Sequence, residues 1–169
     1  MDESEALQDA LFRQLPVLAP RLIEVGAVAQ RLPPDGALLE FQRFSPHQPG
    51  RREEQSWDKP RYLALVLDPS GRVQATDLGE AEPLDRAIAV ALDRTRRQEP
   101  GSDQAWALVA ERLFLPLRTS LAGRRHLLIA PDGQLHRVPF SALALLAGTD
   151  KPLLTGVTLQ TIEIGRAHV

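Results

Sequence analysis

The sequence contains no cysteine, and this absence limits its chemistry more than any other feature. It excludes disulfide bonds, thiolate zinc sites and a cysteine nucleophile anywhere in the 169 residues. A basic surplus is also missing, because the formal net charge is −2 and no positive field is present to attract nucleic acid. We therefore expect no nucleic-acid partner.

Long apolar runs are missing as well. The longest, such as Leu63–Leu67, fall far short of the about 20 residues that a membrane-spanning helix needs. The segment Met1–Gln14 is acidic and amphipathic, and it lacks the basic start and apolar centre of a signal peptide. These features predict a cytoplasmic location and no membrane partner.

What the sequence does contain is the composition of a globular domain, with 43% hydrophobic and 25% charged residues. Its length is enough for one domain with a sizeable core. The apolar run Tyr62–Leu67 predicts a central strand covered on both faces, and the turn Asp68–Gly71 joins it to a hairpin partner. The predicted strands are Ala37–Phe44, Tyr62–Leu67, Val73–Leu78, His126–Ala130 and Leu153–Ile162.

Helical spacing predicts two main helices. The first begins near Pro83 and buries a stripe of apolar residues, while Asp85 faces water. The second runs from Asp103 to about Leu121, and Pro116 is expected to kink it or break its last turn. Shorter helices are predicted at Glu3–Leu15, Arg21–Leu32 and Ser141–Leu146, and a mobile surface loop at Ser45–Lys59. Strands and helices in this order indicate a mixed α/β fold with helices packed on a sheet.

The usual motifs of catalysis and cofactor binding are not found. No phosphate-binding loop, dinucleotide fingerprint or H-E-x-x-H motif occurs, and the four histidines are not spaced with carboxylates as metal ligands would be. Asp132, His136 and Ser141 could be drawn as a triad, but they lie too close together along one turn for the required relay. His136 is expected to make a local hydrogen bond instead. The sequence therefore predicts no catalytic, cofactor-binding or metal-binding residue.

One segment carries a family resemblance. Arg124–Leu143, which reads RRHLLIAPDGQLHRVPFSAL, joins a buried strand, a Pro-Asp-Gly sequence expected to form a type I turn, and a Pro-Phe pair that starts a helix. This segment closely resembles the corresponding motif of CHAT domains. The segments Leu32–Phe44, Pro60–Pro83 and Val157–Ile162 are similar to the family's other strands and follow in the same order. The resemblance extends from about residue 22 to residue 163.

The resemblance implies an incomplete caspase-like α/β sheet flanked by helices, from a family found in bacteria and often preceded by tetratricopeptide repeats. The family's chemistry is that of a cysteine–histidine dyad, in which the histidine of a His-Gly motif activates the thiol. This chain has neither a cysteine nor a His-Gly pair, so no catalytic residue carries over. The positions that correspond to the motif are scaffold, namely Pro131, Asp132, Gly133, Pro139, Phe140 and Leu143.

The resemblance divides the chain into three expected parts. Residues 1–21 are a helical lead-in, which could be the end of a repeat region, and residues 22–163 are the N-terminal part of a CHAT domain. The sequence ends at residues 163–169 with EIGRAHV, a peptide that a common sequencing adapter encodes, so we interpret residues 164–169 as a non-native tail. The competing interpretation is a natural short C-terminus.

Two functions follow as hypotheses from the resemblance, and a third, weaker hypothesis is an unrelated α/β binding domain. In the first, the chain is a fragment of a bacterial CHAT-domain protein whose parent is a caspase-like cysteine endopeptidase, and the fragment itself is inactive. In the second, the domain is a non-catalytic scaffold or regulatory interaction module. In either case the expected partners are proteins, reached through the full-length parent.

Overall fold

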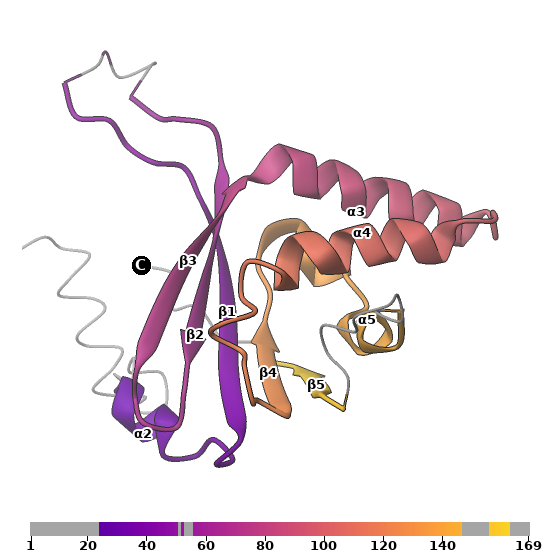
Figure 1. The fold of residues 1–169 in the computed structure, drawn as a ribbon. Coiled ribbons are helices and arrows are strands. Elements are labelled where there is room, and N and C mark those ends of the chain that lie inside the picture. The colour runs from indigo at the N-terminus through magenta and orange to yellow at the C-terminus, as the bar shows by residue number, and fades with distance from the viewer. Residues whose placement is uncertain (1–23, 51, 53–55, 147–155, 163–169) are drawn as a thin grey trace, which may run out of the picture.

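The computed structural model describes residues 24–50, 52, 56–146 and 156–162. Their centre is a five-stranded sheet in the order β3-β2-β1-β4-β5 (Figure 1). β1 pairs antiparallel with β2 and parallel with β4, while β4 pairs parallel with β5. The strands are β1 (Gly36–Phe44), β2 (Arg61–Leu67), β3 (Val73–Glu80), β4 (His126–Ala130) and β5 (Thr158–Thr161).

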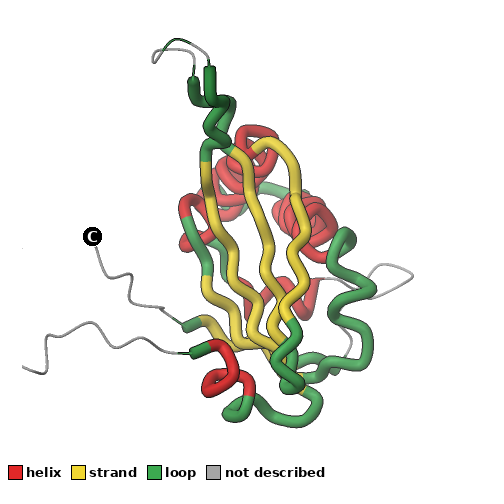
Figure 2. Tube along the Cα trace, turned by 90° about the vertical axis from the view of Figure 1, so that its left-hand side faces the viewer, coloured by secondary structure: helices red, strands yellow, loops and turns green. Residues whose placement is uncertain are grey.

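Among the described α-helices, three lie together on one face of this sheet, and one lies at the lower end of the other face (Figures 1 and 2). Strands and helices thus form the mixed α/β architecture that the sequence predicts, with an open sheet flanked by helices. The inner helices are α3 (Ala81–Arg96), α4 (Ser102–Phe114) and α5 (Phe140–Leu146), and the outer helix is α2 (Val25–Ala29). A short 3-10 helix, η3 (Gly133–Arg137), joins β4 to α5.

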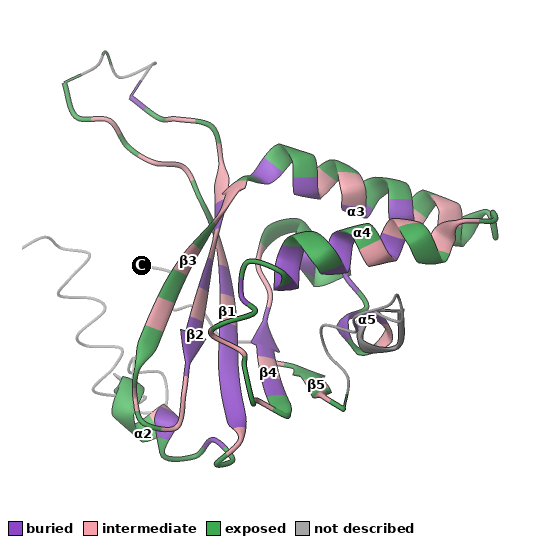
Figure 3. Ribbon diagram, in the orientation of Figure 1, coloured by how far each residue is buried: buried purple, intermediate pink, exposed green. Residues whose placement is uncertain are grey.

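The core fills the space between the sheet and the inner helices (Figure 3). Leu39 of β1 and Ile129 of β4 are paired across the sheet and are both fully buried. The ring of Phe140 stacks on Phe41 with centroids 6.1 Å apart and meets Phe114 edge-on at 6.5 Å. One aromatic side chain from the Pro-Phe pair thereby joins β1, α4 and α5, which explains why the motif ends in phenylalanine.

Several boundaries differ from the predictions. α4 ends at Phe114 and not near Leu121, because proline at position 116 cannot continue the helical hydrogen bonds. The final strand is only β5, Thr158–Thr161, within the part of the predicted range that the structure describes. The predicted helix at Arg21–Leu32 is the five-residue α2 within its described part, whereas Glu3–Leu15 and the tail 164–169 lie outside the described residues.

The predicted interior position of β2 in the sheet is confirmed, but its predicted cover on both faces is wrong. The strand is flanked by β1 and β3, but its burial alternates, with Tyr62, Ala64 and Val66 buried and Leu63 and Leu65 only half-buried. A continuous apolar run does not by itself distinguish full cover on both faces from cover on one face. The loop before β2 contains an isolated bridge between His47 and Trp57, so its described part has more order than the sequence indicates.

Replacing Phe140 by alanine tests the core. Phe140 is 2% exposed and touches two other rings, so we expect Phe140→Ala to lower the free energy of unfolding by about 3–5 kcal/mol. The matched control is Val90→Ala on α3, where the side chain is 49% exposed and the change should stay within about 0.5 kcal/mol. Urea unfolding followed by tryptophan fluorescence measures both, and similar values for the two variants would contradict this packing.

Candidate functional site

The carboxyl ends of β1 and β4 lie at the same edge of the sheet because these strands run parallel. In open α/β sheets this edge is where ligands bind. The Pro-Asp-Gly motif follows β4 directly and reaches back to the end of β1, where the Arg43 N–H donates to Asp132 Oδ2 at 2.7 Å. The Asp132 carboxylate therefore binds the backbone near the end of β1, and this bond positions the residues that follow β4.

Tyr62 links three elements at this edge. Its side chain is buried, and its hydroxyl donates to Asp85 Oδ1 of α3 at 2.8 Å while accepting from the Gln134 N–H of η3 at 3.1 Å. Asp85 also faces the guanidinium of Arg43, with Nε and Oδ2 3.6 Å apart. The prediction that Asp85 faces water is thus wrong, since the start of α3 turns this carboxylate toward Tyr62.

Gly133 sits against this network with almost no free space. Its φ is +57°, a value that favours glycine, and a Cβ at this position would lie 2.8 Å from the Tyr62 hydroxyl and 2.8 Å from Arg43 Cδ. Asp132 is extended, with φ −139° and ψ 157°, so the predicted type I turn is not formed there. Glycine is needed both for the backbone conformation and for the close approach to Tyr62.

Charged side chains surround a hollow of about 220 Å³ beside this network. Its lining carries three carboxylates and two cations, and the cations are paired, Lys59 with Glu80 at 3.2 Å and Arg43 with Asp85. The lining residues are Arg43, Lys59, Pro60, Glu80, Glu82 and Asp85. The lining has no hydroxyl, thiol or imidazole side chain, so these residues supply neither member of a cysteine–histidine dyad.

The triad considered from the sequence does not assemble. Asp132 is engaged by β1, whereas His136 on η3 and Ser141 on α5 are both exposed. Within the described part of the chain neither the His136 imidazole nor the Ser141 hydroxyl has a hydrogen-bond partner, so the local bond expected for His136 is not seen. Among the described residues no group of three or more histidines, aspartates or glutamates is placed to hold a metal ion.

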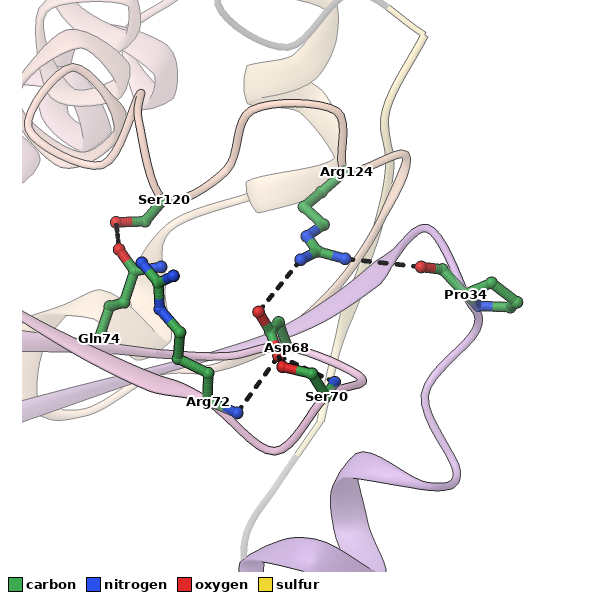
Figure 4. A network of polar contacts seen from close by, with 7 residues as sticks. All are labelled: Pro34, Asp68, Ser70, Arg72, Gln74, Ser120 and Arg124. Carbon is green, nitrogen blue, oxygen red and sulfur yellow. Dashed lines mark hydrogen bonds and ion pairs between the residues drawn. The ribbon is translucent and has the colours of Figure 1, made fainter.

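A second polar network lies at the opposite edge of the sheet (Figure 4). Arg124, at the start of the family-like segment, bonds to Asp68 Oδ2 at 3.3 Å and to the Pro34 carbonyl at 3.5 Å. Ser70 donates to Asp68 through its hydroxyl and its backbone N–H, and these bonds together with the nearby Arg124 guanidinium lower the pKa of the Asp68 carboxyl. The network ties the β2–β3 turn to the entry of β1 and of β4, which is a structural role.

Sequence reasoning missed the residues that make the carboxyl-edge network. The sequence pattern places Tyr62 only in a buried strand and Asp85 on a solvated face. The available signal was that Tyr62 is the chain's single tyrosine and lies in an otherwise aliphatic strand. A buried tyrosine hydroxyl usually needs a polar partner, but the sequence does not show which residues approach it.

Comparison with known families bears on the motif. The CHAT domain family model matches residues 104–168. This match confirms the CHAT-domain resemblance of Arg124–Leu143, and it covers most of α4 and all of β4, η3, α5 and β5. The resemblance of residues 22–103 lies outside the matched range and rests on the order and pattern of their residues. No curated protein matches the chain, and no described helix combines the length and the apolar character needed to cross a membrane.

Gly133→Ala tests the close approach at the motif. We expect it to lower the free energy of unfolding by more than the about 1–2 kcal/mol that a left-handed alanine costs, because its Cβ meets the Tyr62 hydroxyl. Gly71→Ala is the matched control, since φ there is +86° and nothing lies within 4 Å of the added Cβ. Equal losses in chemical unfolding would show that the contact with Tyr62 contributes nothing.

The ionisation of Tyr62 gives a second test. Burial, and then the hydrogen bond to Asp85, raise the pKa of the Tyr62 hydroxyl well above its usual range. The stabilisation from this shift is complete below the unfolded pKa of about 10 and is lost as the pH rises above it. Tyrosinate absorbance should therefore stay low in the folded protein at a pH where free tyrosine ionises, a measurement that the single tyrosine makes direct.

Tyr62→Phe is the partner variant for this titration. It leaves Gln134 N–H and Asp85 without the hydroxyl, so we expect it to lower the free energy of unfolding near neutral pH by about 1–2 kcal/mol. The difference between the two proteins should shrink as the pH rises above about 10. A normal tyrosine titration in the folded wild-type protein would contradict the assigned network.

Proposed function

We propose that this chain forms the scaffold of a caspase-like cysteine peptidase domain whose catalytic cysteine and histidine are supplied by sequence outside these 169 residues. The observation that carries the proposal is the position of the CHAT-like motif, which lies at the carboxyl edge of parallel strands and contains no cysteine. Asp132 and Gly133 are used there to anchor β1 and to approach Tyr62. This is the role of a support beside a reaction centre.

The proposed chemistry follows from the family resemblance. The parent's histidine would favour the thiolate of its cysteine, and the thiolate would attack the carbonyl carbon of a peptide bond. The parent is proposed to be a bacterial, cytoplasmic endopeptidase acting on protein substrates, with tetratricopeptide repeats before the domain. In this reading the described edge contributes a rigid platform and a charged surface, and it contributes no proton transfer.

A non-catalytic interaction module is the second candidate, and one observation favours it. Trp57 is 62% exposed, and its ring meets His47 edge-on at 4.8 Å in the loop that extends from β1 and β2. Exposed tryptophan is enriched where proteins bind one another, because it buries a large area at low entropic cost. A scaffold without the dyad would use such a surface for a partner protein.

The genomic sequence across Ile162 decides between the two candidates. For the peptidase we expect the reading frame to continue through a His-Gly pair and a later cysteine, and the complete protein should be labelled by a thiol-reactive peptide probe. Replacing that cysteine by serine should abolish the labelling, and the present chain, which has no thiol, serves as the unlabelled control. A stop codon directly after Val169 in genomic DNA would overturn the peptidase proposal and favour the interaction module.

A further inference from the structure

Among the described residues, few lie over the outer face of the sheet along most of its length. Figure 2 looks onto this face, and among the described helices only α2 lies in front of the strands, at their lower end. There α2 and the residues after it form a small cluster with the sheet. Its members are Val28, Ala29, Leu32, Leu38, Leu67, Leu128 and Ile162.

The strand register shows what lies above this cluster. Leu65 of β2 is paired with Ala75 of β3, and Leu67 is paired with Val73, so these side chains share the outer face with Leu63. Leu63 and Leu65 are half-buried, Ala75 is exposed, and Val73 is 47% exposed. An apolar strip therefore continues upward from α2 along β2 and β3.

Polar residues limit the width of this strip. Glu40 of β1 stands opposite Leu65, and Gln42 stands opposite Leu63. On the other side Asp77 of β3 is paired with Leu63. The apolar surface is thus about as wide as one helix, which is too narrow to favour stacking against the sheet of a second copy.

The chain itself holds a segment that suits the strip. Leu7, Leu11, Leu15 and Leu18 recur at helical spacing, which places them on one face, while Glu5, Asp9 and Arg13 fall on the opposite face. Thirteen helical residues span about 20 Å, close to the about 24 Å of a seven-residue strand. β2 has seven residues, so the lengths agree.

The connection also allows this arrangement. α2 begins at Val25 on the outer face, and the residues between position 16 and this helix can extend to about 30 Å. A short tether of this kind gives the segment a high effective concentration at the strip, which a separate partner lacks. We propose that residues 3–15 pack as an amphipathic helix on the outer face, over Leu63, Leu65, Val73 and Ala75. The lead-in is then part of the domain and not a join to a repeat region.

The absence of native cysteine makes a cross-linking test clean. The Leu11→Cys, Leu65→Cys double variant, treated with a short bismaleimide, should give an intramolecular cross-link found by mass spectrometry. Leu7→Cys and Leu15→Cys combined with Leu65→Cys cover a shift of register, so at least one of the three pairs must react. Leu11→Cys with Val90→Cys is the control, because Val90 is exposed on α3 on the other side of the sheet.

The reactivity of the single variant Leu65→Cys gives an independent measurement. Leu11→Glu added to it should raise the rate of thiol labelling about tenfold or more, since a buried charge would displace the segment from the strip. Asp9→Lys added to it is the control, because position 9 is on the opposite helical face and the rate should not change. Cross-links that form only between two copies, or a labelling rate unchanged by Leu11→Glu, would overturn the proposal.

Discussion

The approach of Gly133 to the Tyr62 hydroxyl is the contact on which the carboxyl edge of the sheet depends. A Cβ at position 133 would lie 2.8 Å from that oxygen, which is too close, so the backbone after β4 can take this course without a clash only with glycine at position 133. The same hydroxyl donates to Asp85 and accepts from Gln134, which joins β2, α3 and η3 through one buried atom. A neutral hydroxyl can donate and accept at the same time, so it keeps its hydrogen-bond partners when it is buried. Burial also raises its pKa, because the charged form would lose its hydration.

The two edges of the sheet are held by different means. At the carboxyl edge the partners are a buried tyrosine and the backbone of Gln134, directly after the Pro-Asp-Gly residues. At the opposite edge Arg124 and Asp68 form a largely covered ion pair, and Ser70 supports it. Between them the apolar core, joined by Phe140, Phe41 and Phe114, supplies most of the stabilisation. The family-like segment contributes to all three regions, which gives a structural reason for its length.

This arrangement explains how a segment can match the CHAT domain model through side chains that serve the fold. Residues 104–168 match the CHAT domain model, and their described side chains pack, cap and anchor. In the proposed peptidase, the cysteine and the histidine come from sequence outside this chain. The hollow beside Tyr62 is lined by charged side chains, of which Arg43 is paired with Asp85 and Lys59 with Glu80.

The sequence by itself determined the element types, the α/β class, the break at Pro116 and the CHAT resemblance, because local spacing and turn residues carry that information. It could not determine that Asp85 faces inward, that Leu63 and Leu65 are only half-covered, or that Gly133 lies against Tyr62. Those facts depend on which elements meet, since position 62 and position 133 approach only after β2, β1 and β4 have paired. Only the tertiary structure decided them, because burial and hydrogen-bond partners are properties of neighbours in space and not of neighbours in the chain.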